Sequence, residues 1–193
     1  MKKETSFGSL REHEREARRD IIVAAAERVF AVRPFDQVSI RDIAREAGIS
    51  HASIYRYFPD QRALFVEAFL RGAEKLERLI DGAADGGIGS ITDTYIRFLI
   101  DNDQYFRMMT HFMLDGSLSG EQLERLNVTE RKLLERLDLV FGPSKNARKL
   151  SHAFFAAMNG VLISFRNYPG RSREEVTTHM LELGRIIASK FGK

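Results

Sequence analysis

The sequence contains no cysteine, no tryptophan and only four prolines among its 193 residues. Without cysteine the chain can form neither a disulfide nor a thiolate metal site, and it has no thiol nucleophile. Its five histidines are not spaced as ligands on one helix face, and no motif of an activated nucleophile is present. We therefore expect no metal, no cofactor and no enzymatic activity.

Long hydrophobic runs are also missing. No stretch approaches the roughly 18 uninterrupted apolar residues of a membrane span, and the opening MKKETSFGS lacks the apolar segment of a signal peptide. An excess of one sign of charge is missing as well, because the chain has 30 Lys and Arg and 27 Asp and Glu. We predict a cytoplasmic protein without membrane contact, in which any nucleic-acid binding depends on a few well-placed residues.

Apolar residues recur at helical spacing along the whole chain, and no alternation typical of strands is found. The sequence therefore predicts an all-α fold of about nine helices. We expect the first helix to begin near Ser9, another to cover residues 60–81, and the glycine-rich segment 81–90 to form a loop. Later helices should follow a break at 101–103 and begin near Ser119, Ser144 and Ser172.

The most informative segment is SIRDIAREAGISHASIYRYFPDQRAL, residues 39–64. Ser39 is placed to cap a short helix, with Asp42 completing the capping box. Gly48 follows that helix, where a left-handed residue commonly ends one. Ser50 can then cap a second helix. Two short helices joined by a glycine form a helix-turn-helix, and the second one carries mixed polar and aromatic groups suited to a DNA groove.

With these residues in register, the segment from Arg19 to Leu64 resembles the DNA-binding domain of the TetR/AcrR family of bacterial transcriptional regulators. The matching residues are AAAERVF with Phe35 after it, Ser39, Ile43, Ala44, AGIS at 47–50, SIYRYF at 53–58 and Leu64. The resemblance implies a helix-turn-helix DNA-binding domain at residues 1–62 and a helical effector-binding and dimerisation domain at residues 63–193. Two positions depart from the family pattern: Pro34 replaces a glycine, and Gln61 replaces a lysine that contacts phosphate.

The resemblance further implies a ligand-responsive repressor that binds a palindromic operator as a homodimer and is released by a hydrophobic small molecule. Arg41 is placed to read a guanine edge, and Ala52 offers only a methyl group, which suits thymine. The residues expected to contact DNA are Ser39, Arg41, Arg45, Ser50, His51, Ala52, Ser53, Tyr55, Arg56, Tyr57 and Gln61.

Aromatic and methionine side chains are concentrated on two predicted helices between residues 91 and 114. Such a stripe is typical of a core, but in a member of this family it also suits an apolar effector pocket. Polar groups on the helix near residue 155 could add recognition. The candidate pocket residues are Tyr95, Phe98, Tyr105, Met108, Met109, Phe112, Met113, His152, Phe155 and Asn159.

The predicted helix 144–166 is apolar nearly all the way round, which favours a position either inside a large core or between its own domain and another subunit. The candidate interface residues are Leu150, Phe154, Ala157, Met158, Val161, Phe165, Val176, Met180, Leu183 and Ile187. One alternative stays open: a DNA-binding protein of the same fold whose second domain binds a protein partner. A closed core at residues 91–165 would favour that alternative, and an enclosed apolar cavity would favour a ligand sensor.

Overall fold

The computed structural model describes residues 2–114, 118 and 120–191, and within them it contains nine α-helices, two short 3-10 turns and no strand. The predicted all-α fold is therefore confirmed. In chain order the elements are α1 Lys2–Val32, η1 Phe35–Gln37, α2 Ile40–Ala47, α3 His51–Ile54, α4 Gln61–Ala83, η2 Ala84–Gly86, α5 Gly87–Asp101, α6 Asp103–Leu114, α7 Gly120–Phe141, α8 Ala147–Phe165 and α9 Arg173–Phe191. None of the helices in this described part is long and apolar enough to cross a bilayer.

The described residues form two compact units. The first contains residues 2–71 and 107–114, and the second contains residues 72–106, 118 and 120–191. Both α4 and α6 begin in one unit and end in the other.

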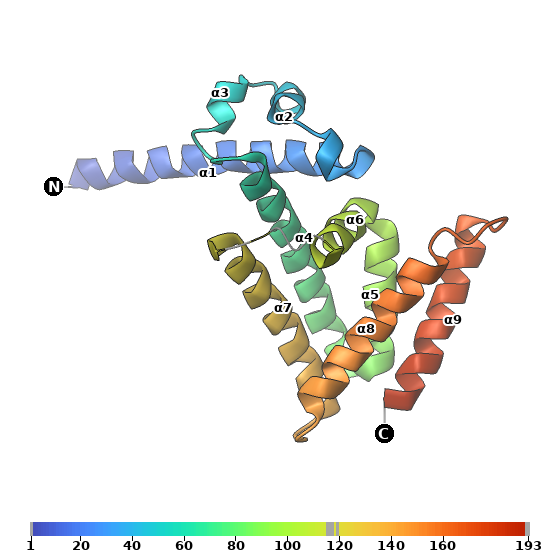
Figure 1. Cartoon of the computed structure of the whole chain (residues 1–193). Helices are drawn as coiled ribbons and strands as arrows, with labels where there is room; N and C mark the ends of the chain where they lie inside the picture. Colours follow the sequence, from blue (N-terminus) through green and yellow to red (C-terminus); the bar gives the residue numbers. More distant parts are fainter. Residues whose placement is uncertain (1, 115–117, 119, 192–193) are drawn as a thin grey trace. The chain divides into compact units, whose positions relative to one another are not determined.

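In the first unit, α2 and α3 lie on one side of the long helix α1 (Figure 1). Ile22 of α1, Ile43 of α2 and Ile54 of α3 are at most 1% exposed and belong to one apolar core. Each isoleucine comes from a different helix, so burying all three fixes the helices against one another. Leu64 closes this core from the first turns of α4.

Aromatic rings bring the second half of α6 into the first unit. Phe65 of α4 contacts Phe35 at 4.6 Å and Phe112 of α6 at 4.9 Å between ring centroids. His111 lies 5.0 Å from the Phe35 ring, and Met108 is buried in the same core. This part of α6 therefore helps to complete the core around α1, α2 and α3.

In the second unit α5 packs against α7, α8 and α9, and α8 packs against both α7 and α9 (Figure 1). α5 and α9 approach each other closely at Gly184. A Cβ atom built at Gly184 would lie 2.8 Å from Cγ2 of Thr92 and in closer contact with Cδ1 of Ile96. Gly184 thus faces α5, whereas Gly160 of α8 has no heavy atom within 4 Å of that position.

Two local predictions were wrong. α1 begins at Lys2 instead of near Ser9, and the segment 81–90 is not a loop, because α4 continues to Ala83 and α5 begins at Gly87. Each glycine costs a helix only about 1 kcal/mol, which the buried flanking residues Ile80 and Ile91 outweigh. A single left-handed residue, Gly87 with φ 68°, produces the turn.

Other boundaries agree with the sequence. The break between α5 and α6 falls at Asn102, and Ser172 forms the expected capping box, since its N–H donates to Oε2 of Glu175 at 2.8 Å. α8 begins at Ala147, three residues beyond Ser144. The predicted cap Ser119 lies outside the described residues.

Candidate nucleic-acid interface and apolar pocket

The capping box predicted for α2 is present. Ser39 N–H donates to Oδ2 of Asp42 at 3.0 Å, and Asp42 N–H donates to Oγ of Ser39 at 3.3 Å. Arg33 and Arg45 both pair with the same carboxylate, at 3.3 and 2.9 Å. The hydrogen bonds from the Ser39 hydroxyl and backbone, with a smaller effect of Arg33, lower the pKa of Asp42 to about 2. Asp42 therefore stays ionised and holds the start of α2.

The connection from α2 to α3 also follows the prediction. Gly48 adopts the left-handed conformation with φ 68° and ψ 28°, and its N–H bonds back to the carbonyls of the last turn of α2. Ser50 then caps α3, because its Oγ accepts the N–H of Ser53 at 3.2 Å. Ile54, with 0% exposure, anchors α3 in the core. The opposite face of this short helix is left to solvent.

That exposed face carries four of the eleven residues expected at DNA. His51, Ala52 and Arg56 are exposed, and Tyr55 is 53% exposed. Arg41, at the start of α2, is exposed as well. Together they present imidazole, methyl, phenol and guanidinium groups on the surface of α2 and α3, which are the groups that read base edges and phosphates.

Other predicted contacts already have intramolecular roles. The hydroxyls of Ser50 and Ser53 are 2.8 Å apart and share a hydrogen bond. Tyr57 is half-buried against the core. The amide Nε2 of Gln61 donates to the carbonyl of Phe35 at 3.0 Å. Gln61 thus joins the start of α4 to η1, a role that sequence reasoning missed, and this N–H is committed to the fold.

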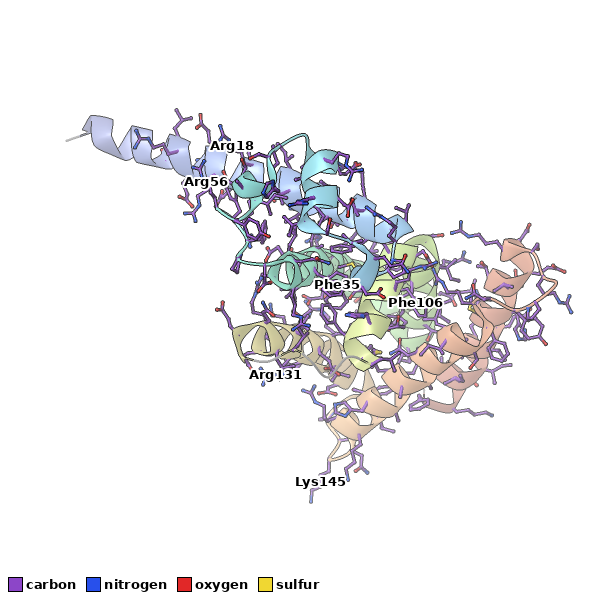
Figure 2. All side chains as sticks on the ribbon, turned by 45° about the horizontal axis from the view of Figure 1, so that its top comes forward. Arg18, Phe35, Arg56, Phe106, Arg131 and Lys145 are labelled. Carbon is purple, nitrogen blue, oxygen red and sulfur yellow. The ribbon has the colours of Figure 1, made fainter. Side chains whose placement is uncertain are left out.

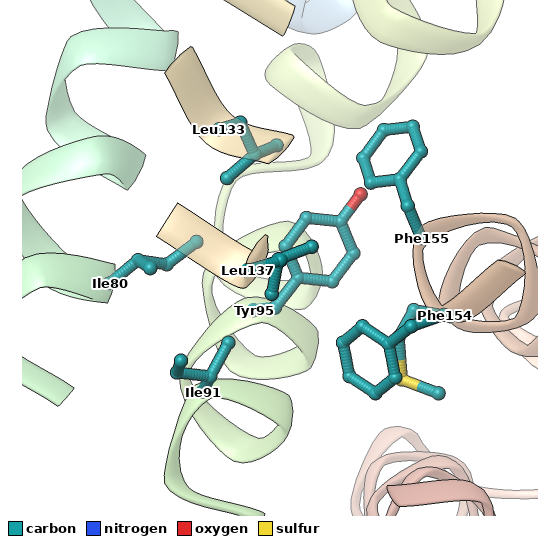
Figure 3. Close-up of a pocket in the computed structure, with 8 residues that line it drawn as sticks. Ile80, Ile91, Tyr95, Leu133, Leu137, Phe154 and Phe155 are labelled. Atoms are coloured by element: carbon teal, nitrogen blue, oxygen red, sulfur yellow. The ribbon is translucent and has the colours of Figure 1, made fainter. Parts of the chain in front are cut away.

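A small apolar cavity lies in the second unit. It is lined by Ile80, Ile91, Tyr95, Leu133, Leu137, Phe154, Phe155 and Met158 (Figure 3). Its volume is about 10 Å³, which is space for roughly one water molecule and far below the roughly 300–1,000 Å³ of a typical ligand pocket. The core in this region is therefore closed.

One polar pair borders the cavity. The hydroxyl of Tyr95 donates to Oδ1 of Asn159 at 2.8 Å, and both side chains are buried. Burial, followed by the nearby Tyr105, raises the pKa of Tyr95 well above its ordinary value. Tyr95 is therefore a neutral hydrogen-bond donor at physiological pH, next to a wall that is otherwise apolar.

The structure brings together only part of the predicted pocket. Tyr95 and Phe155 line the cavity, and Asn159 bonds Tyr95. Met108 and Phe112 pack in the first unit. The remaining candidates divide by burial: Phe98, Tyr105 and Met109 are buried, whereas His152 is exposed and Met113 is 47% exposed. The cavity walls that sequence reasoning missed, such as Leu133 and Leu137, have the spacing of ordinary core residues.

The predicted dimer residues are also divided. Five of them are buried within the chain itself: Phe154, Met158, Val161, Val176 and Met180. The other five are half-buried: Leu150, Ala157, Phe165, Leu183 and Ile187. The exposed side of α8 instead carries small residues, including Ala153, Ala156 and Gly160, and then Ile163 at 61% exposure. On α9 the most exposed large apolar residue is Ile186, at 58%.

Comparison with known proteins agrees with this geometry. Residues 22–68 match the family model described as bacterial regulatory proteins, tetR family. An uncharacterized HTH-type transcriptional regulator of Haemophilus influenzae is 33% identical over 98 residues, which are 48% of this chain and 48% of that protein. The alignment thus spans about half the length of that curated relative.

Solved structures resemble nearly the whole chain. A transcriptional regulator from Aquifex aeolicus superposes with a TM-score of 0.67 at 14% identity, covering 88% of this chain and 99% of that one. NalD, the secondary repressor of the MexAB-OprM multidrug efflux pump in Pseudomonas aeruginosa, gives a TM-score of 0.60 at 22% identity, covering 88% and 94%. At these identities the likeness establishes the fold.

The lowered pKa of Asp42 makes the capping box sensitive to acid. The folded-state pKa of about 2 lies below the ordinary value of 3.8, so the carboxylate stabilises the fold above pH 3.8 and loses that effect as the pH falls toward 2. Asp42→Asn should therefore lower the melting temperature by a few degrees at pH 7 and by progressively less below pH 4. Circular dichroism melts of both proteins across this range measure the difference; a difference that is constant with pH would contradict the role of the charge.

Proposed function

We propose that this chain, whose residues 22–68 match the model of the tetR family of bacterial regulatory proteins, binds double-stranded DNA as a transcriptional regulator and acts as a repressor. The observation that carries the proposal is the solvent-facing side of α3, where His51, Ala52 and Tyr55 are exposed on a helix that is capped and anchored in a core. Proteins of this family are regulators and not enzymes. DNA as the target also implies that the chain works in the cytoplasm.

Each exposed group has a chemical role at DNA. Arg41 donates to the O6 and N7 acceptors of guanine, and the methyl group of Ala52 contacts the methyl group of thymine. His51 and Tyr55 complete the base-reading surface, while Ser39, Ser50, Ser53, Arg45, Arg56 and Tyr57 contact the backbone. Gln61 supports this surface mainly through its bond to Phe35. Because a neutral amide replaces a cation, this position adds little to the salt dependence of binding.

We further propose that two subunits associate through α8 and α9, so that residues 1–62 bind DNA and residues 63–193 hold the dimer and the effector. A two-fold dimer presents two α3 helices to a palindromic operator. The exposed small residues Ala153, Ala156 and Gly160 support this assignment, because they permit close approach of another helix. Ile163 is the apolar residue of that surface that would gain most from burial.

The effector is proposed to be a hydrophobic molecule with one hydrogen-bonding group. The cavity beside Tyr95 supports this, since an apolar wall and a single donor-acceptor pair would orient such a ligand. The cavity has a volume of only about 10 Å³, so the ligand would have to displace side chains such as Met158 and Phe155. A ligand that favours the opened state would release DNA by its difference in affinity for the two states.

The closed cavity also supports a second candidate. A space of about 10 Å³ is what a fully packed core leaves, as expected of a regulator whose second unit binds a protein partner instead of a small molecule. DNA binding is common to both candidates. They differ in whether any small molecule stabilises the protein and releases DNA.

DNA binding is tested first. Fragments of the source genome bound by the purified protein at near-physiological salt should share a palindrome with half-sites about ten base pairs, or roughly 34 Å, apart. Tyr55→Ala should weaken binding to that operator about tenfold or more and relax its specificity, whereas Tyr168→Ala, an exposed tyrosine in the second unit, should not. Random recovered fragments, or equal effects of the two substitutions, would contradict the proposal.

The dimer is tested by a matched pair of substitutions. Ile163→Glu places a charge on the small-residue side of α8 and should convert the dimer to a monomer, because an unpaired charge at an interface is strongly unfavourable. Leu139→Glu makes the same change on α7 at a residue that is 82% exposed and should leave the dimer intact. Sedimentation velocity measures the mass of each; a monomeric parent protein or a dimeric Ile163→Glu variant would refute the interface.

The effector site is tested with a panel of amphipathic compounds in thermal-shift and DNA-release assays. A compound that releases DNA and donates to or accepts from Tyr95 should lose about tenfold in affinity with Tyr95→Phe, which removes one hydroxyl. Tyr168→Phe serves as the control and should change nothing. If no compound in a broad panel raises the melting temperature or releases DNA, the protein-partner alternative is favoured.

A further inference from the structure

An open groove lies in the first unit where α1 passes the end of α3. It is lined by Arg11, Glu14, Arg15, Arg18, Arg56 and Tyr57. Figure 2 shows Arg18 and Arg56 side by side at this place. Four of the six lining residues are arginines, in a chain whose formal net charge is only +3. The groove is therefore a local concentration of positive charge and not a reflection of the average composition.

The three arginines of α1 share one face of the helix. Arg11, Arg15 and Arg18 are separated by four and three residues, so their side chains lie one above another. The next position on this face is Ile22, which is 1% exposed in the core. Glu16 and Asp20 fall on the other side of the helix, whereas Glu14 lines the groove with the arginines. Positive charge therefore outnumbers negative charge on the face that borders the groove.

These arginines have no acidic partner among the described residues: Arg11, Arg15, Arg18 and Arg56 take part in none of the ion pairs found there. Arg19, by contrast, pairs with Glu67 at 2.8 Å and lies over the Phe58 ring at 5.1 Å. Four guanidinium groups beside a single carboxylate, Glu14, repel one another. A bound anion relieves that repulsion, and phosphate matches the two-pronged geometry of the guanidinium group.

We propose that this groove, which we call the arginine groove, binds backbone phosphates of DNA that flank the operator half-site. The inference rests on the proposed function and extends it to a surface outside the helix-turn-helix. Arg56 and Tyr57 lie two and three residues beyond Ile54, the last residue of α3, so a duplex read by α3 would continue past the groove. From Arg11 to Arg18 the helix rises about 10 Å, enough to meet more than one phosphate. The contact adds affinity without sequence preference.

The test uses the full-length double variant Arg11→Gln with Arg15→Gln. Both side chains are exposed, so the fold is retained. Fluorescence anisotropy follows binding to the selected operator between about 50 and 200 mM salt, a range over which phosphate contacts change affinity strongly, on one duplex that ends at the palindrome and one with flanking base pairs. The variant should bind the longer duplex several-fold more weakly, with a salt slope reduced by about 0.9 for each arginine that contacts a phosphate.

The variant should also gain nothing from the flanking base pairs, whereas the parent protein gains affinity from them. Lys132→Gln with Lys145→Gln, two exposed lysines of the second unit, removes the same charge and should leave the slope and the length dependence unchanged. If the parent protein binds the operator but the arginine variant keeps the same slope and length dependence, the arginine groove is refuted and the proposed function stands. If the parent protein binds no operator, the proposed function itself fails.

Discussion

The surface that we propose for DNA binding depends on the burial of Ile54. α3 is a helix of four residues, far shorter than the roughly 12–15 that an isolated helix needs, so backbone hydrogen bonds alone cannot maintain it. Ile54 is fully enclosed among residues of α1, α2 and α4, and Ser50 and Gly48 fix the chain on the other side. The exposed positions of His51, Ala52 and Tyr55 follow from this anchor. The interface is a consequence of core packing and not of helix propensity.

The second unit is organised around α5, which is buried on several sides. Tyr95 of this helix borders the cavity, while Thr92 and Ile96 meet α9 at Gly184. The same helix thus carries the one polar residue among those that line the cavity, and it also makes a close contact with α9. Arg166, at the end of α8, links that helix to the last turns of α5, because it donates to the carbonyl of Leu99 at 2.8 Å. It also pairs with Asp103. The second unit is therefore stabilised by the packing of α5 against α9 and by the hydrogen bonds of Arg166.

The helix-turn-helix could be predicted from sequence because its signals are local. A capping serine, a left-handed glycine and apolar residues at helical spacing each act within a few positions, and Ser39, Gly48 and Ser50 all do what the pattern predicts. The loop predicted at 81–90 was wrong, because the cost of glycine in a helix is small compared with the stabilisation from burying Ile80 and Ile91.

Apolar spacing was less informative in the second unit, because it predicts burial but not the partner. Phe154 and Met158 have the pattern of an interface, yet they pack against their own subunit. The aromatic stripe of α6 likewise gave no sign that Tyr105 and Phe112 belong to different units. Gln61 was expected at phosphate, and its bond to Phe35 joins positions 26 residues apart, a distance over which sequence patterns carry no signal.

Gly184 gives the second unit a particular mechanical property. Where two helices meet through side chains on both sides, small displacements are absorbed by rotamer changes in both helices, but at Gly184 only the side chains of Thr92 and Ile96 separate α5 from the backbone of α9. α9 contributes no side chain to this contact, so any adjustment there falls to α5 alone. A side chain at position 184 would have to displace those of Thr92 and Ile96.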